Sequence, residues 1–486
     1  MGRFKKEIIT QQGIDKREVG YYSTPDFIAK YITKELLALN PNGVKVLDPA
    51  TGKEELLKHF YNNGKEIDSF DIVNYGEKKY SSFIHADFLE YYQEKKRSLF
   101  FSEQIDLEYD YIIANPPYNC HEVDYIRKNK ERLNLLFKEV GTYNMYSMFL
   151  SAIVDSAKEG ALIGVIVSDS FLTASMHCNL RKQLLSECAI HQIILCPTDL
   201  FANQKADVRT CILILQKGTK FQSDVLIANR PANTENLKDI LKNRKLIKTS
   251  IDKVSIESDP LHRFVIDVDM SISNLFSLPK IGDIFQCVTG ISTGNDKHYL
   301  SPIRKEGYDI PFYKNPGKRK FRTQPDAYLI NNFMEESTHV KNFIVRNKKM
   351  IFEEGITCSS MGLPFSACYL PKNSAFGVNA NIFTPKEDIF WMISYLNSSL
   401  VTYIVRGVLI RSNMVTSGYI SQIPILSFSS HEKEKLQKIC TNALNDNVPA
   451  NDAIAQIDEI VFNNISIESS LANKVTSFAA NLTKAV

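Results

Sequence analysis

The sequence predicts an α/β protein whose first half folds as a doubly wound, mostly parallel sheet. Short apolar runs alternate with amphipathic helical patterns from about residue 25 to residue 216. Strands separated by helices form parallel sheets that are covered on both faces. The last two apolar runs are joined without a helix, which predicts one antiparallel hairpin at the edge of the sheet. A turn-rich second half predicts a mixed α+β domain.

The expected elements follow one another in chain order. The expected strands cover residues 44–47, 67–70, 109–114, 161–167, 193–195 and 208–216, and a helix is expected at 55–61. Upstream, either Ser23 or Thr24 is expected to cap a helix that begins after Pro25. Changes in composition predict a first domain over 1–245, a connecting segment over 246–279, a second domain over 280–428 and a helical tail over 429–486.

Bulk composition limits the class of protein. The chain of 486 residues is 44% hydrophobic and 23% charged, which is ordinary for a globular protein, and its net charge is +3. Nine cysteines without C-x-x-C spacing predict reduced thiols in the cytoplasm and no zinc site or other metal site. No apolar stretch is long enough to span a membrane, and the N-terminus lacks the apolar core of a signal peptide. We therefore expect a cytoplasmic monomer that does not bind membranes.

The most informative motif is Asn115-Pro116-Pro117-Tyr118, which follows an apolar strand. Prolines donate no hydrogen bond and keep the backbone extended. The strand end therefore presents two acceptors, the side-chain oxygen of Asn115 and the carbonyl of Pro116, beside the aromatic ring of Tyr118. Two acceptors and a flat ring suit a planar amino group that loses a proton as it attacks an electrophile. The motif predicts methylation of an amino group on a conjugated system.

Three acidic motifs predict a nucleoside-containing cofactor. Asp48-Pro49-Ala50-Thr51-Gly52 ends the first strand, where ligands bind in doubly wound sheets. Asp71, at the end of the next strand and followed by Ile72, is spaced to accept ribose hydroxyls. Asp87 and Phe88 offer an acceptor and a ring for adenine. Taken singly, an aspartate at the end of a strand is more often a turn residue. The glycine motif is not a phosphate-binding loop, because the neighbouring positions lack the first glycine and the Ser/Thr that such a loop requires.

Together these motifs resemble those of S-adenosylmethionine-dependent DNA adenine-N6 methyltransferases, in the order in which the cofactor-side helix precedes the Asp-Pro-Ala strand. The resemblance covers residues 20–216 and implies a seven-stranded methyltransferase sheet followed by a target-recognition domain. It makes the first domain the catalytic one. It implies that S-adenosylmethionine is bound by Thr24, Asp48, Ala50, Gly52, Asp71, Ile72, Asp87, Phe88, Asn115 and Pro117.

The same resemblance assigns the target adenine to the Asn115–Tyr118 motif. A base inside a duplex is inaccessible, so it must be flipped out and held between aromatic rings. The segment 199–216 resembles the last catalytic motif of the family, which places Phe201 opposite Tyr118 as a stacking partner. Without that resemblance, Phe201 is equally well explained as a core residue.

The cofactor loop departs from the family pattern. Lys53 and Glu54 stand where the family usually has Ser-Gly. Three outcomes are open for Glu54: it pairs with the ammonium of the cofactor, it weakens cofactor binding, or it points into solvent.

A cluster of cations in the second domain is the candidate surface for double-stranded DNA. Five basic residues occur within nine positions, which favours phosphate contact, although such a run can also be a solvated loop. The members are Lys314, Lys318, Arg319, Lys320 and Arg322.

Two other functions compete with DNA methylation. The same motif serves methylation of RNA adenine or of a protein glutamine amide, and a degenerate cofactor loop would leave a catalytically impaired DNA-binding module. No segment shows a convincing nuclease pattern, so a restriction endonuclease or defence-system subunit is expected as a separate polypeptide. Such a pairing would place the chain in a restriction-modification system.

Overall fold

The computed structural model describes residues 22–98, 108–119, 123–201, 208–255, 259–360, 364–409 and 414–484. The chain divides into two compact units, residues 1–267 and 268–486. The division falls inside the connecting segment that was predicted at 246–279. No helix in these described ranges combines the length and apolar character needed to cross a membrane.

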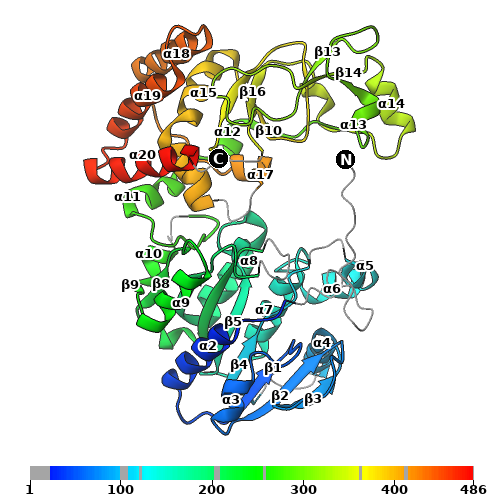
Figure 1. Cartoon of the computed structure of the whole chain (residues 1–486), viewed down its shortest axis with the longest axis vertical. Coiled ribbons are helices and arrows are strands. Elements are labelled where there is room, and N and C mark those ends of the chain that lie inside the picture. Colours follow the sequence, from blue (N-terminus) through cyan, green and yellow to red (C-terminus); the bar gives the residue numbers. More distant parts are fainter. Residues whose placement is uncertain are drawn as a thin grey trace. The chain divides into compact units, whose positions relative to one another are not determined.

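The first unit is built on one large sheet (Figure 1). Its described strands follow the order β3-β2-β1-β4-β5-β7-β6-β8-β9. The strands are β1 (Lys45–Asp48), β2 (Glu66–Asp71), β3 (Ser82–His85), β4 (Tyr111–Ala114), β5 (Leu162–Ser168), β6 (Cys188–Leu195), β7 (Thr210–Lys217), β8 (Val225–Ala228) and β9 (Ile247–Thr249). The strands from β3 to β5 pair in parallel, and strand order reverses between β1 and β4.

Helices cover both faces of this sheet because alternate residues of its central strands are apolar on both sides. Ile112 and Ala114 of β4 pack in one core cluster, and Tyr111 and Ile113 pack in the other. The helices of this unit are α2 (Asp26–Leu39), α3 (Lys58–Asn62), α4 (Phe88–Ser98), α5 (Asp124–Lys128), α6 (Lys130–Leu136), α7 (Met145–Ser156), α8 (Cys178–Glu187), α9 (Thr234–Asn243) and α10 (Ile251–Val254).

The predicted doubly wound sheet is confirmed, with two differences. The antiparallel hairpin forms from β6 and β7, but it does not lie at the edge, because β8 pairs with β6 and β9 extends the sheet further. The sheet also has nine described strands where the resemblance implied seven, and β8 and β9 lie beyond residue 216, at which the last expected strand ends.

The second unit is mixed α+β, as predicted. Its described sheets are β10-β19-β16-β17, β11-β15 and β12-β14-β13-β18. The strands are β10 (Gln286–Val288), β11 (Ile291–Ser292), β12 (Leu300–Ser301), β13 (Ile310–Tyr313), β14 (Ala327–Leu329), β15 (Ile344–Val345), β16 (Gly355–Cys358), β17 (Ala367–Leu370), β18 (Ala375–Phe376) and β19 (Asn381–Phe383). Helices of this unit include α11 (Met270–Ser273), α12 (Ile281–Ile284), α13 (Asp296–Tyr299), α14 (Phe333–His339), α15 (Ile389–Asn397), α16 (Ser399–Tyr403) and α17 (Ser417–Ile420).

The C-terminal segment is helical and packs on the rest of the second unit. It forms α18 (Ser430–Leu444), α19 (Ala450–Asn464) and α20 (Ser469–Lys484). The first of these begins at a capping box, in which Ser429 and Glu432 satisfy each other's backbone N–H groups. Contacts of α18 with α15 and of α20 with α16 join the segment to the domain core.

Gly164 in β5 permits the close approach of α2 to the sheet. A Cβ atom at this position would lie 2.4 Å from Cγ2 of Ile32 and 3.0 Å from Cδ1 of Leu36. Both neighbours are fully buried, so they have no free space into which to move.

We predict that Gly164→Ala lowers the free energy of unfolding by about 1–3 kcal/mol, because overpacking forces α2 away from β5. Urea unfolding of the full chain measures the change. The matched control is Gly377→Ala, another buried glycine whose added Cβ would meet nothing closer than 3.5 Å. Equal stability of the two variants would contradict the packing explanation.

Candidate active site

The predicted site residues gather at the carboxyl ends of the parallel strands. Asp48 is the last residue of β1, Asp71 is the last residue of β2, and Asn115 directly follows β4. Because these strands run in the same direction, their ends meet at one edge of the sheet. This edge is the place where strand order reverses, which is the usual ligand site of such folds.

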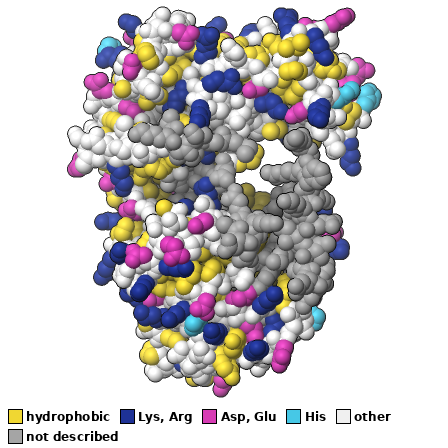
Figure 2. All heavy atoms as spheres, viewed as in Figure 1, with side chains coloured by type: hydrophobic (Ala, Val, Ile, Leu, Met, Phe, Trp, Pro, Cys, Tyr) yellow, Lys and Arg dark blue, Asp and Glu magenta, His cyan; other side chains and the backbone are white. Residues whose placement is uncertain are grey.

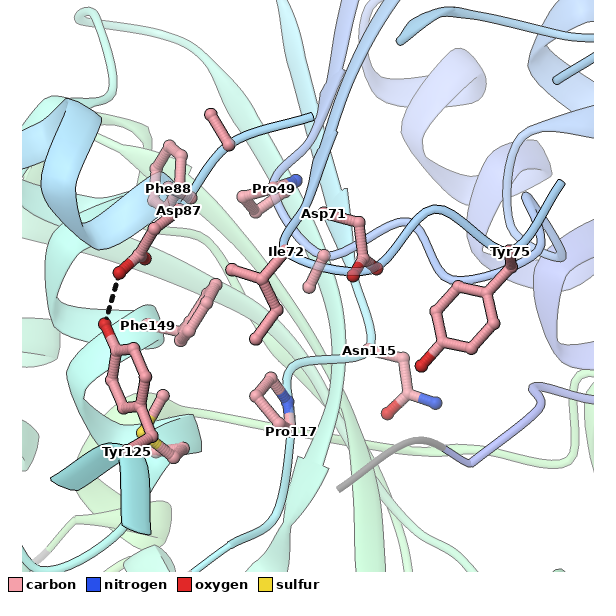
Figure 3. Close-up of a pocket in the computed structure, with 13 residues that line it drawn as sticks. Pro49, Asp71, Ile72, Tyr75, Asp87, Phe88, Asn115, Pro117, Tyr125 and Phe149 are labelled. Atoms are coloured by element: carbon pink, nitrogen blue, oxygen red, sulfur yellow. Dashed lines mark hydrogen bonds between the residues drawn. The ribbon is translucent and has the colours of Figure 1, made fainter. Parts of the chain in front are cut away.

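A cleft with about 540 Å³ of empty space lies at this edge and is open to solvent. Its lining includes the predicted residues Ala50, Asp71, Ile72, Asp87, Phe88, Asn115 and Pro117. In Figure 3, Ile72 and Phe149 lie between the side that carries Asp87 and the side that carries Asp71 and Asn115. Three other predicted cofactor residues, Thr24, Asp48 and Gly52, do not line the cleft.

Asp71 is held by the backbone of two loops. Its carboxylate accepts hydrogen bonds from the N–H of Gly52 at 2.8 Å and from the N–H of Val73 at 2.8 Å. Gly52 has a φ of 56°, a conformation that suits glycine because it has no Cβ. Burial raises the pKa of Asp71, opposed by these two N–H donors. The backbone of Gly52 thus orients a carboxylate of the cleft, and its predicted contact with a cofactor remains a prediction.

Asp87 is anchored by a tyrosine that the sequence did not single out. The hydroxyl of Tyr125 in α5 donates to the Asp87 carboxylate at 2.5 Å, as Figure 3 shows. The N–H of Leu89 donates to the other oxygen at 2.9 Å, and Arg132 approaches at 3.4 Å. The carboxylate at this end of the cleft is therefore fixed in direction before any ligand binds.

Asp48 stabilises the turn that follows β1. One carboxyl oxygen accepts from the N–H of Ala50 at 3.0 Å, and the other is buried and has no hydrogen-bond partner among the described residues. Burial raises the pKa of Asp48 to about 8, the Ala50 N–H opposes this shift, and the carboxylates of Asp71 and Glu55 add to it. The turn interpretation is thus observed. The predicted contact of Asp48 with a cofactor remains a prediction.

Glu54 is bound inside the protein, so its predicted alternative of pointing into solvent is wrong. The residue is 3% exposed and has a φ of 63°. Its carboxylate accepts from the N–H of Lys79 at 2.7 Å, the N–H of Tyr80 at 3.1 Å and the hydroxyl of Ser81 at 2.7 Å. These bonds fasten the cofactor loop to the segment between β2 and β3, which also carries the cleft residue Tyr75.

The side chain of Asn115 is hydrogen-bonded at both ends. Its Nδ2 donates to the carbonyl of Tyr22 at 2.8 Å and to Oγ1 of Thr24 at 2.9 Å. Its Oδ1 accepts from the hydroxyl of Tyr118 at 2.5 Å. The predicted cap of α2 by Ser23 or Thr24 is wrong, because Pro25 occupies the N-cap position without a side-chain bond. The hydroxyl of Thr24 is engaged by Asn115 instead.

Three aromatic rings meet beside Asn115. The rings of Tyr118 and Phe201 lie 6.4 Å apart at 60°, so they meet edge to face. Tyr22 stacks on Tyr118 at 5.6 Å and 27°. Phe201 is 1% exposed, and in this conformation its side chain packs in the hydrophobic core of the first unit. Residues 202–207 of the predicted last motif lie outside the described residues.

Several residues of the site were not selected from the sequence. They are aromatic or apolar side chains, and most of them come from segments without a recognisable motif, although Pro49 lies inside the Asp48–Gly52 motif and Ala86 precedes Asp87. The missed residues are Tyr22, Pro49, Tyr75, Ala86, Tyr125, Met145 and Phe149.

The predicted DNA-binding cations of the second unit have partners within that unit. Lys314 pairs with Asp296, Arg319 lies 3.3 Å from Asp326, and Arg322 lies 2.7 Å from Asp446. These pairs are exposed, and exposed pairs contribute little stability, so they can exchange for phosphate.

Lys320 differs from the other cations of this cluster. Its ammonium donates to the carbonyl of Asn397 at 3.2 Å, and burial lowers its pKa to about 8. This position favours a structural role for Lys320.

Known proteins resemble the chain in sequence and in fold. The type II methyltransferase M.BanIII of Aneurinibacillus aneurinilyticus is 31% identical over 40% of this chain, and M.BsuBI of Bacillus subtilis is 28% identical over 44%. The chain matches 38% and 46% of these two relatives, so it spans less than half of either one. The type IIL restriction-modification enzyme MmeI, solved in complex with DNA, shares the fold with a TM-score of 0.62 at 12% identity, over 97% of this chain and 79% of that one.

A family model completes the comparison. The model described as N-6 DNA Methylase matches residues 9–259, which include the sheet, the cleft and the Asn115–Tyr118 motif. The chain belongs to the N-6 DNA methylase family.

Proposed function

We propose that this chain is a DNA methyltransferase that transfers a methyl group from S-adenosylmethionine to N6 of a flipped-out adenine. The observation that carries the proposal is the hydrogen-bonded amide of Asn115 at the end of β4, which lines a cleft that also carries two carboxylates and several apolar side chains. In this proposal the first unit is catalytic, and the second unit reads the DNA.

The cleft offers what an adenosine moiety needs. Carboxylates lie on both sides of it, at Asp71 and Asp87, with the apolar side chains of Ile72 and Phe149 between them. Ribose hydroxyls and an adenine amino group are hydrogen-bond donors, so each matches a carboxylate acceptor. When bound, S-adenosylmethionine supplies an electrophilic methyl group on a sulfonium sulfur.

The Asn115–Pro116 corner activates the target amine. The lone pair of an adenine amino group is delocalised into the ring, which makes the amine a poor nucleophile. Acceptance of both N–H bonds, by Oδ1 of Asn115 and the carbonyl of Pro116, favours a tetrahedral nitrogen with a localised lone pair. The same acceptors would stabilise the positive charge that develops on nitrogen as the N–C bond forms and the S–CH3 bond of the sulfonium breaks, which leaves a neutral thioether. Because the nitrogen can lose its proton after transfer, the site needs no strong base.

The aromatic group is suited to hold an extruded base. Tyr22, Tyr118 and Phe201 lie within stacking distance of one another beside Asn115. Tyr22 stacks on one face of Tyr118, so a base that takes that face must displace the ring of Tyr22. Unstacking and unpairing a base cost a few kcal/mol, and contacts in such a pocket recover part of that cost.

We assign double-stranded DNA to the second unit as its partner. On the face shown in Figure 2, lysine and arginine side chains lie interspersed with acidic ones, so charge alone does not define the DNA surface. The loop with Lys314, Lys318, Arg319 and Arg322 remains our candidate for phosphate contact. M.BanIII is a type II methyltransferase and MmeI is a restriction-modification enzyme; a separate restriction endonuclease or defence subunit remains our candidate for a further partner of this chain.

Asn115→Ala tests the proposed function directly. We expect the methylation rate to fall about 10²- to 10³-fold, the usual effect of removing one preorganised polar contact from a transition state. Single-molecule sequencing of DNA from cells that express the chain measures N6-methyladenine and its sequence context. The matched control is the exposed Asn63→Ala, which should methylate like the wild type. Wild-type turnover by Asn115→Ala would refute the assignment.

Glu54→Ala tests the cofactor loop. We expect the dissociation constant for S-adenosylmethionine to rise about tenfold, because three donors lose their acceptor and the loop is no longer fastened to the segment with Tyr75. Isothermal titration measures the constant. Ser81→Ala, which removes one of these bonds, should weaken binding in the same direction but less. The exposed neighbour Lys53→Ala is the control. If Glu54 instead met the cofactor ammonium, Ser81→Ala would leave affinity unchanged.

Arg319→Ala and Arg322→Ala test the DNA surface. Each should reduce the slope of log affinity against log salt concentration by about one, as expected for a lost phosphate contact. Fluorescence anisotropy of labelled duplex at several salt concentrations gives the slope. Lys320→Ala is the comparison, since its ammonium binds a protein carbonyl and its loss should change stability rather than the slope. Unchanged slopes in both arginine variants would show that DNA binds to a different surface of the chain.

A further inference from the structure

The orientation of the Asn115 amide decides whether it can act on an amine. An amide side chain has an acceptor end and a donor end of nearly equal size. Only the oxygen can accept a hydrogen bond from the amino group of adenine. A rotation of half a turn would present N–H groups to N–H groups, and the acceptor would be lost. The fold must therefore fix this one torsion.

The segment before α2 supplies the means to do so. Both N–H bonds of Asn115 Nδ2 have acceptors there, the carbonyl of Tyr22 at 2.8 Å and Oγ1 of Thr24 at 2.9 Å. A carbonyl can only accept, so the reversed amide would place two oxygens against each other at the Tyr22 position. The polarity of the Tyr22 carbonyl thus sets the direction of the amide, and Thr24 satisfies the remaining N–H.

Within the part of the chain that the structure describes, the hydroxyl of Thr24 has one hydrogen bond, to the amide of Asn115. The residue is 5% exposed and does not line the cofactor cleft. Pro25, with a φ of −59°, begins α2 without help from a threonine cap. The hydroxyl of Thr24 is therefore available to the Asn115 amide, from which it is separated by 91 positions in the sequence.

We propose that Thr24 is a positioning residue that acts through Asn115, holding the amide oxygen toward the target amine. This inference rests on the proposed function and adds a residue to its machinery. It differs from the role predicted from the family resemblance, in which Thr24 contacts the cofactor. The two roles predict different kinetics: a positioning residue changes the rate of methyl transfer, whereas a cofactor contact changes cofactor affinity.

Thr24→Val and Thr24→Ser separate these roles. Valine keeps the shape of threonine but cannot accept a hydrogen bond, and serine keeps the hydroxyl. With saturating cofactor and duplex, we expect Thr24→Val to lower the single-turnover methylation rate about tenfold, since one buried N–H loses its partner. Thr24→Ser should restore the rate to within about twofold of the wild type. Isothermal titration should give both variants wild-type affinity for S-adenosylmethionine.

The control is Thr33→Val on the adjoining helix α2. Thr33 is 2% exposed, and its hydroxyl has no hydrogen-bond partner among the described residues, so the same substitution removes no contact. Its methylation rate and cofactor affinity should match the wild type. Thermal unfolding of all three variants shows whether a loss of rate follows a loss of folded protein.

Three results would overturn the inference while leaving the proposed function intact. They are a wild-type rate in Thr24→Val, a rise in the cofactor dissociation constant that accounts for the whole loss, and a Thr24→Ser variant as slow as Thr24→Val. Absence of N6-methyladenine in the wild-type reaction would overturn the proposed function, and this inference with it.

Discussion

The parallel pairing of β4 with β1 is the constraint on which the candidate active site depends. Val46 pairs with Tyr111 and Leu47 with Ile112, so the two strands end side by side at the reversal of strand order. Both faces of β4 are buried, and each packs in a different core cluster. If the pairing of β4 with β1 shifted by one residue, every side chain of β4 would move to the opposite face of the sheet. The register is therefore held by core packing. The same register sets the separation between the cofactor loop after β1 and the acceptors after β4.

Around this fixed edge, the loops are held by hydrogen bonds rather than by regular structure. Gly52 orients Asp71, Glu54 fastens the loop after β1 to the segment before β3, and Tyr125 fixes Asp87. Each bond joins a loop that follows one strand to a loop or short helix that follows another. The cleft is therefore largely preformed, and a ligand that enters it need not organise the carboxylates first.

The sequence predicted most of the sheet and the principal site residues, because both are local patterns. Apolar runs of four to eight residues mark buried strands, and Asn115-Pro116-Pro117-Tyr118 has a chemistry that can be interpreted without neighbours. It did not predict β3, whose burial pattern is mostly exposed, and it also missed β8. It also did not predict pairings between distant segments. The Tyr125–Asp87 bond spans 38 positions, and no local pattern encodes such a contact.

The hydroxyl of Tyr118 satisfies the amide oxygen of Asn115, the acceptor to which we assign the target amine. A buried amide oxygen without a donor costs about 1–3 kcal/mol, which would favour collapse or rotation of the Asn115 side chain. In this structure Tyr118 donates to that oxygen at 2.5 Å and lies 3.1 Å from the carbonyl of Ile166. When an adenine amine arrives, its N–H can take the place of the hydroxyl, and the hydroxyl still has the Ile166 carbonyl as an acceptor. One hydrogen bond replaces another, so the acceptor stays oriented and satisfied before and after base flipping.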